Sequence, residues 1–282
     1  MTISTIDLRA PGGPVPIPQL GFGVWQVPED GVRDAVAEAL RVGYRHIDTA
    51  RIYDNETGTG EAIASSGIFR EDIFVTTKVW NDDQGRERTL AAFDASMARL
   101  GLDYLDLFLI HWAAPGRRQY AETWETLLEL RGTGRVRAVG VSNFHASHLQ
   151  DAYDRTGEWP AINQIELHPY LQQRELRAFH AEHGIVTEAW SPLASGKDVL
   201  EDPVIATIAD KHQVTPAQAI LGWHLALGNV VIPKSVTPSR IAENFGSVDV
   251  VLDGDDLAAI ESLDRGMRTG PDPDQFWSGD DD

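Results

Sequence analysis

The sequence predicts a (β/α)₈ barrel, and three observations support this prediction. Eight short apolar runs recur along the 282 residues, and amphipathic stretches of helical period lie between them. Alternating strands and helices are typical of parallel strands joined by crossover helices. Eight such units in a chain of this length match the size of this barrel. We expect one domain over residues 1–282, because no linker or change of composition interrupts the pattern.

The expected elements follow one another in a regular order. Residues 3–17, with Pro-Gly-Gly at 11–13, indicate a β-hairpin that precedes the eight units. The expected strands span 20–25, 43–48, 73–78, 105–111, 136–142, 161–165, 185–190 and 230–233. Apolar residues at helical spacing predict helices over 30–42, 89–100, 120–133, 174–183 and 215–227. In the last of these, Thr215 is a suitable cap and Pro216 suits the first turn.

A doubly wound sheet is the competing architecture. Dinucleotide-binding sheets of that kind carry G-x-G-x-x-G directly after their first strand. This chain has only Gly21-Phe22-Gly23 at the corresponding place, which is too weak a match. The barrel is therefore the preferred prediction.

Charge and composition exclude several function classes. The chain has 24 Lys and Arg against 43 Asp and Glu, a net charge of −19, which disfavours nucleic acid and anionic membranes as partners. It has no cysteine, which excludes disulfides and thiolate metal sites. No signal peptide or membrane-spanning run is evident, so we expect a cytoplasmic protein. We interpret the acid-rich stretch from 249 onward as solvated surface and residues 278–282 as a flexible acidic tail.

Polar and aromatic residues stand at the ends of most expected strands. They are Asp48, Lys78, His111, Ser142, Asn143, Gln164, Trp190 and Lys234. In a barrel of parallel strands the carboxyl ends all meet at one face, and that face carries the active site. Strands often end in polar residues without any function, but seven of eight strands doing so favours a site.

Four of these residue types together suit proton transfer. Tyr53 lies close in sequence to Asp48, and a phenol is a poor acid at neutral pH. An ammonium such as Lys78 favours the phenolate and lowers its pKa, and a carboxylate such as Asp48 keeps the ammonium charged. A neutral imidazole, here His111, can orient a carbonyl oxygen by a hydrogen bond. Tyr53 could then protonate an oxygen that becomes alkoxide as a hydride arrives.

Three motifs in this order resemble the aldo-keto reductases, most closely the short bacterial branch that includes 2,5-diketo-D-gluconate reductases. The first runs from Gly43 through Asp48 and Tyr53 to Glu56, and the second is Ile162-Asn163-Gln164-Ile165-Glu166-Leu167-His168-Pro169. The third starts at Ile232-Pro233-Lys234-Ser235-Val236 and continues to Asn244. The resemblance implies a barrel with a C-terminal loop over its active site and NADPH-dependent reduction of aldehydes, dicarbonyls or keto-sugars. It also implies Tyr53 as general acid, tuned by Lys78 and Asp48, with His111 orienting the carbonyl.

The resemblance also implies a binding site for NADPH or NADP. Ser142, Asn143 and Gln164 would hold the nicotinamide carboxamide, Trp190 would stack on the nicotinamide ring, and Gly23, Val24 and Trp25 would border its ribose. Ser191, Leu193 and Ser195 resemble contacts to the pyrophosphate. Lys234, Ser235, Val236 and Arg240 would surround the 2′-phosphate, which Arg can bind in a bidentate manner. Glu243 and Asn244 resemble adenine contacts.

Further expectations concern the substrate and the alternatives. Trp25, Trp80 and Trp112 each follow a strand end and resemble the walls of a carbonyl pocket, while Phe276 and Trp277 lie in the tail that could cover it. We expect a small carbonyl substrate and a monomer. A nucleotide-binding regulatory subunit with little turnover is one alternative. A metal-dependent hydrolase using His46, Asp48, His111 and His168 is another, but Lys78 would repel a cation there, so we expect no metal.

Overall fold

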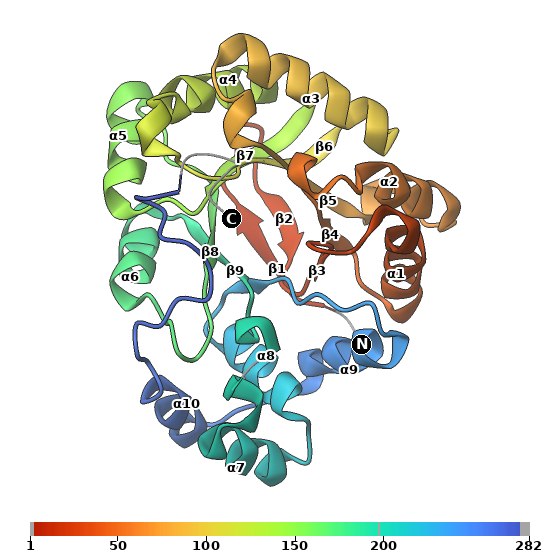
Figure 1. Cartoon of the computed structure of the whole chain (residues 1–282), viewed down its shortest axis with the longest axis vertical. Coiled ribbons are helices and arrows are strands. Elements are labelled where there is room, and N and C mark those ends of the chain that lie inside the picture. Colours follow the sequence, from red (N-terminus) through yellow and green to blue (C-terminus); the bar gives the residue numbers. More distant parts are fainter. Residues whose placement is uncertain (1–2, 197, 277–282) are drawn as a thin grey trace.

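Eight parallel strands line the axis of the computed structural model, which describes residues 3–196 and 198–276 (Figure 1). The strands are β3 (Phe22–Gly23), β4 (His46–Asp48), β5 (Phe74–Val79), β6 (Leu105–Ile110), β7 (Val136–Ser142), β8 (Ile162–Glu166), β9 (Val186–Trp190) and β10 (Val230–Val231). Each pairs with the next in sequence order. The ring closes where Gly21 N donates to Val231 O at 2.9 Å and Val231 N donates to Gln19 O at 2.8 Å. The predicted barrel is confirmed, and the doubly wound sheet is wrong.

A β-hairpin covers the amino-terminal end of the barrel, as predicted. Its strands β1 (Thr5–Leu8) and β2 (Val15–Pro18) are antiparallel and appear behind the barrel centre in Figure 1. Buried Leu8 and Ile17 pack there against residues in the amino-terminal halves of the barrel strands, such as Phe74 and Leu107. The apolar hairpin face therefore closes this end of the barrel.

Helices surround the barrel on its outside (Figure 1). They are α1 (Glu29–Val42), α2 (Glu56–Ser65), α3 (Arg86–Leu100), α4 (Tyr120–Gly132), α5 (Ala146–Thr156), α6 (Arg174–His183), α7 (Pro203–His212), α8 (Pro216–Ala226), α9 (Pro238–Phe245) and α10 (Gly254–Glu261). The five predicted helices correspond to α1, α3, α4, α6 and α8, and Thr215 caps α8 as expected. Among the described residues, no helix has the length and apolarity needed to cross a bilayer.

The structure shows why the apolar pattern failed to predict two of the helices, α2 and α10. In α2 the buried face includes Gly58 and Gly60 in place of large apolar side chains, which hides the helical period. In α10 the acidic run is structural rather than merely solvated: Asp253 caps the helix and Asp256 is buried. Asp256 accepts hydrogen bonds from Lys211 at 2.8 Å and His212 at 2.7 Å. These partners hold the pKa of Asp256 well below its ordinary value in spite of desolvation.

The glycine at position 60 permits close packing of α2 against the end of α3. A Cβ atom there would overlap the backbone oxygen of Leu100, which cannot move without displacing the helix end. We expect Gly60→Ala to destabilise the protein by about 1–3 kcal/mol in urea unfolding, the usual cost of overpacking. Gly132→Ala is the control, since a Cβ there meets nothing within 4 Å. Equal stabilities of the two variants would refute this account.

Side chains inside the barrel form two layers of opposite character. Alternate residues of each strand point inward, and near the hairpin these are apolar, as with Leu107, Leu109 and Ile162. Toward the carboxyl ends of the strands the inward residues are polar and buried. This polar layer consists of His46, Asp48, Thr76, Lys78, Gln164 and Glu188. The face predicted to carry the site therefore rests on a buried polar layer.

Candidate active site

The four residues predicted for proton transfer lie together at the carboxyl ends of β4, β5 and β6. Lys78 Nζ donates to Asp48 Oδ1 at 2.6 Å and lies 3.4 Å from the Tyr53 hydroxyl. That hydroxyl lies 3.5 Å from His111 Nε2. The phenol therefore stands between an ammonium and an imidazole, with the carboxylate behind the ammonium.

Burial and neighbouring charge act in opposite directions on these groups. Burial raises the pKa of Tyr53 and outweighs Lys78, which lowers it as expected, so the phenol binds its proton more tightly than an ordinary tyrosine. Burial disfavours the ammonium of Lys78, but Asp48 and Tyr53 more than compensate, and its pKa is raised. Burial, helped by Lys78, lowers the pKa of His111, so its imidazole is neutral. The lowering of the Tyr53 pKa expected from Lys78 alone is therefore reversed.

The residues predicted at the nicotinamide carboxamide form one hydrogen-bonded group. Ser142 Oγ donates to the backbone oxygen of Gln164 at 2.8 Å, and Asn143 Nδ2 donates to the backbone oxygen of His111 at 3.0 Å. Trp190 Nε1 donates to Asn143 Oδ1 at 2.8 Å. The indole of Trp190 is thereby fixed beside the amide groups at the barrel mouth.

The other predicted cofactor residues lie on loops around the mouth. Gly23 and Val24 are buried next to Asp48, and Trp25 is half-exposed. After Trp190 the chain turns sharply, with Ser191 and Ser195 both at positive φ and their hydroxyls 3.3 Å apart.

Two exposed cations stand near the start of α9. Lys234 and Arg240 form neither a hydrogen bond nor an ion pair with any side chain in residues 3–196 and 198–276. Buried Ser235 accepts a hydrogen bond from Thr237 N at 3.1 Å, and Val236 is exposed. Glu243 is already bonded to Thr215 at 2.8 Å, while Asn244 is buried. The two cations are therefore available to an anion.

Aromatic rings cluster beside Tyr53 and His111. The Trp80 ring lies 5.1 Å from that of His111, and both Trp80 and Trp112 contact Phe276, with centroid distances of 6.0 and 4.6 Å. Phe276 thus carries the C-terminal loop over the site. Trp277 and residues 278–282 lie outside the described part of the chain.

A family model described as "Aldo/keto reductase family" matches residues 19–265. The chain belongs to the aldo-keto reductase family. It is 58% identical over 260 residues to an aldo-keto reductase of Mycolicibacterium smegmatis, covering 92% of this chain and 94% of that protein. It is 54% identical over 261 residues to the methylglyoxal reductase DkgA of Escherichia coli K12, with the same coverage. A crystal structure of a Gox0644 mutant in complex with NADPH matches with a TM-score of 0.93 and 48% identity, covering 98% of this chain and 99% of that one.

In this aldo-keto reductase a buried glutamate anchors the C-terminal loop, a role that the sequence did not reveal. Glu166 Oε1 accepts from Thr269 N at 2.6 Å and Thr269 Oγ1 at 2.7 Å, and Oε2 accepts from Gly270 N at 3.2 Å. His168 Nε2 lies 3.1 Å from the same carboxylate. Burial alone raises the pKa of Glu166, but these hydrogen bonds outweigh it and the pKa is lowered. The only available signal was position: Glu166 lies within the Gln164 motif, at the carboxyl end of β8.

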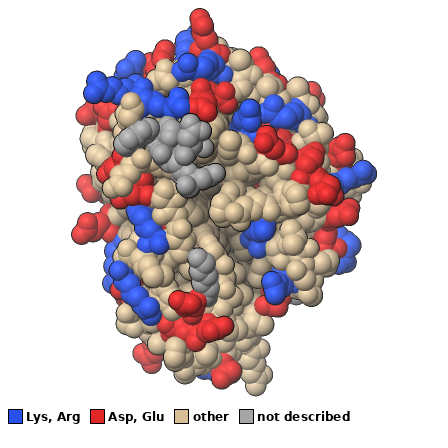
Figure 2. Space-filling model, viewed as in Figure 1, with Lys and Arg blue, Asp and Glu red and all other residues tan. Residues whose placement is uncertain are grey.

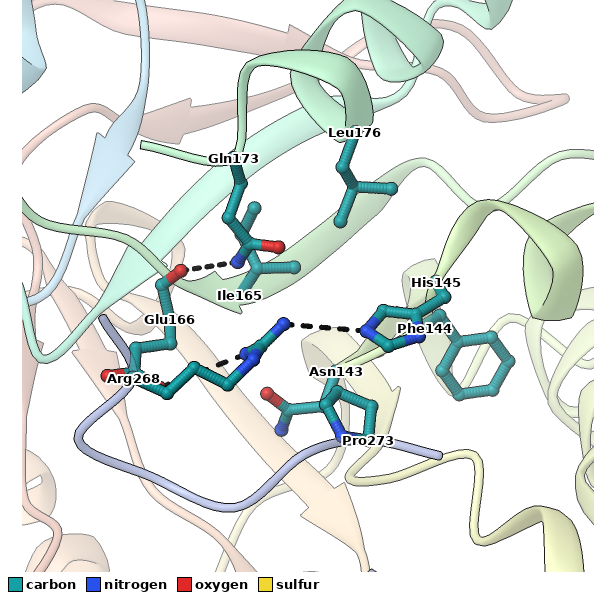
Figure 3. A pocket seen from close by; sticks show the side chains of 9 residues that line it. All are labelled: Asn143, Phe144, His145, Ile165, Glu166, Gln173, Leu176, Arg268 and Pro273. Carbon is teal, nitrogen blue, oxygen red and sulfur yellow. Dashed lines mark hydrogen bonds and ion pairs between the residues drawn. The ribbon is translucent and has the colours of Figure 1, made fainter. Parts of the chain in front are cut away.

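A narrow pocket lies between this anchor and α5 (Figure 3). Arg268 crosses it from the C-terminal loop and reaches His145 Nε2 at 3.4 Å. Asp274 on the same loop lies 3.1 Å from His145 and 3.3 Å from His148. The pocket therefore belongs to the attachment of the loop.

The arrangement around Asp48 disfavours a metal ion. Both of its carboxylate oxygens accept hydrogen bonds, one from Lys78 and the other from Gln164 Nε2 at 2.9 Å. A cation there would face an ammonium and an amide N–H group. The alternative based on His46, Asp48, His111 and His168 is further weakened because His168 pairs with Glu166 instead.

Charged side chains are unevenly distributed over the face that carries the barrel mouth. Figure 2 shows acidic and basic side chains along most of its periphery, and a few basic side chains closer to its centre among uncharged residues.

Proposed function

We propose that the protein reduces aldehydes, dicarbonyls or keto-sugars to alcohols, with Tyr53 as the general acid. The observation that carries this proposal is the Tyr53 hydroxyl, which lies within 3.5 Å of both Lys78 Nζ and His111 Nε2 at the mouth of the barrel. A phenol that keeps its proton, held beside a fixed ammonium, is suited to protonating an oxygen that gains negative charge.

The cofactor is NADPH/NADP, and when bound it supplies or accepts the hydride. Lys234 and Arg240 fit its 2′-phosphate, because they are exposed cations that no described residue pairs with. Ser142, Asn143 and Gln164 offer amide and hydroxyl groups for the carboxamide, and Trp190 offers an indole face. The further assignments are Gly23, Val24 and Trp25 to the ribose, Ser191, Leu193 and Ser195 to the pyrophosphate, Ser235 and Val236 to the 2′-phosphate, and Glu243 and Asn244 to adenine.

Each of the four catalytic residues then has a distinct task. His111, neutral because burial lowers its pKa, donates a hydrogen bond that orients the substrate oxygen. Tyr53 gives its proton to that oxygen, and Lys78 stabilises the resulting phenolate. Asp48 keeps Lys78 charged and in place through the 2.6 Å bond. Trp25, Trp80 and Trp112 form the walls against which a small carbonyl compound packs.

A substrate panel tests the proposal. We expect the purified protein to oxidise NADPH, followed by absorbance, in the presence of methylglyoxal, a nitrobenzaldehyde or a diketogluconate. A folded protein that binds NADPH but turns over none of a broad carbonyl panel would overturn the reductase proposal and support the nucleotide-binding regulatory alternative.

The preference for NADPH over NADH gives a second test. We expect Arg240→Ala to weaken NADPH binding by about tenfold, the size of one charge-assisted hydrogen bond, and to leave NADH binding unchanged. Arg33→Ala is the control, because Arg33 is an exposed cation that pairs with Glu61 on α2. An equal loss for both cofactors would contradict the assignment of Arg240 to the 2′-phosphate.

A further inference from the structure

Glu188 is a fully buried acid inside the barrel that the predicted catalytic set does not include. It lies on β9 directly beside Gln164 of β8, its partner in the strand register. Gln164 Nε2 donates to Glu188 Oε2 at 3.0 Å and to Asp48 Oδ2 at 2.9 Å. Glu188 thus shares a hydrogen-bond donor with the acid that supports Lys78.

These two hydrogen bonds determine which way the Gln164 amide faces. An amide nitrogen carries two N–H donors, and both are taken by the two carboxyl groups. In the flipped orientation the amide oxygen would face the carboxylate of Asp48, which repels it, and the two N–H groups would lose both acceptors. The oxygen of the amide is therefore left to face away from the polar layer, and no described side chain donates a hydrogen bond to it.

Glu188 has no cation of its own among the described residues. Lys78 is paired with Asp48 at 2.6 Å. His46 Nε2 lies 3.8 Å from Glu188 Oε1, and burial, with Lys78, lowers the pKa of His46 to about 3. Burial and the charge of Asp48 raise the pKa of Glu188 to about 8, against the Gln164 hydrogen bond and Lys78. The titratable groups facing Glu188 are thus Asp48 and His46 from β4 and Lys78 from β5, with Tyr53 beyond them.

We propose that Glu188 is a positioning residue that, as a neutral acid near neutral pH, holds the Gln164 amide oxygen toward the nicotinamide carboxamide. The oxygen is then already oriented to accept a hydrogen bond from the carboxamide NH₂. A neutral Glu188 also adds no second negative charge beside Lys78, whose ammonium stays available to Asp48 and Tyr53. This inference rests on the proposed NADPH-dependent function.

The ligand test compares Glu188→Gln, which keeps an acceptor for Gln164, with Glu188→Leu, which removes it. Binding is followed by quenching of intrinsic tryptophan fluorescence, with NADPH and with adenosine 2′,5′-bisphosphate, which lacks the nicotinamide. We expect Glu188→Leu to weaken NADPH binding by about fivefold to tenfold, the size of one hydrogen bond, and Glu188→Gln to restore it to within about twofold. The bisphosphate should bind all variants equally.

The control on the same strand is Thr187→Val, which removes a 2.9 Å contact with His180. It should change the binding of neither ligand. If Glu188→Leu does not fold, Glu188→Ala carries the same comparison. Equal losses for NADPH and bisphosphate, or unchanged NADPH binding in Glu188→Leu, would overturn the inference. Absence of turnover by the wild type would instead overturn the proposed function, and the binding comparison would remain readable.

The protonation state of Glu188 has its own readout in the protein without cofactor. The ordinary glutamate pKa is 4.5, so the stabilisation due to the neutral buried acid is complete below that pH and is lost as pH rises through about 8. The glutamine side chain in Glu188→Gln does not titrate, so this variant does not lose stability in this way as pH rises. We therefore expect the Tm of Glu188→Gln minus that of the wild type to rise between pH 6 and pH 9. A Tm difference that does not change with pH would overturn the inference that Glu188 is a neutral acid near neutral pH.

Discussion

Tyr53→Phe is expected to lower kcat for carbonyl reduction by about 10²–10⁴-fold, the usual contribution of a general acid. The substitution keeps the ring between Lys78 and His111 and removes only the transferable proton. NADPH binding should therefore stay within about twofold. The measurement is NADPH absorbance at saturating cofactor, together with a fluorescence titration of NADPH binding.

Tyr120→Phe is a matched control for this variant. The Tyr120 hydroxyl donates to Asp151 at 2.7 Å on the outside of the barrel, so its loss should leave kcat unchanged. Because burial raises the pKa of Tyr53, we also expect the wild type to keep this proton across pH 6–9. A Tyr53→Phe enzyme within tenfold of wild type would show that the proton comes from another group.

Lys78→Met is expected to destabilise the fold by about 3–5 kcal/mol, because it leaves the buried carboxylate of Asp48 without its cation. Lys78 and Asp48 are both buried, and their bond measures 2.6 Å. Urea unfolding at pH 7 measures the loss. Without Lys78, a buried Asp48 is less unfavourable when it is protonated. The loss of unfolding free energy in Lys78→Met should therefore increase as pH rises.

The double variant Lys78→Met/Asp48→Asn separates charge from packing. It removes both charges, and the amide oxygen introduced at position 48 can still accept the Gln164 hydrogen bond. We therefore expect it to recover most of the stability lost in Lys78→Met. A double variant as unstable as the sum of the two single ones would show that the pair is not coupled. Neither variant should reduce carbonyls at a substantial rate.

The strands, five of the helices and the grouping of the four proton-transfer residues could be predicted because their signals are local. Apolar period and turn residues mark the strands, and Asp48, Lys78 and His111 each stand at a strand end. The network beneath them could not be predicted, because Glu188 and Glu166 have partners that are remote in sequence. Gln164 is 24 residues from Glu188, and Thr269 is 103 residues from Glu166.

The sequence also could not show which of two opposing effects on a pKa is the larger. The residue types show that Lys78 lowers the Tyr53 pKa, but only the depth of burial shows that desolvation outweighs it. The glycines of α2 conceal a helix for a related reason. Gly60 has no side chain that could contribute to an apolar pattern. Only the structure shows that the backbone oxygen of Leu100 leaves no room for a Cβ atom there.

The attachment of the C-terminal loop bears on how this enzyme can change over evolution. Glu166 binds the loop largely through the main-chain N–H groups of residues 269 and 270, which nearly every amino acid possesses. The side chain of Phe276 takes no part in these hydrogen bonds and can therefore be exchanged while they persist. Mutations at Phe276 can change the aromatic surface that it forms with Trp80 and Trp112 without breaking the hydrogen bonds by which Glu166 holds the loop.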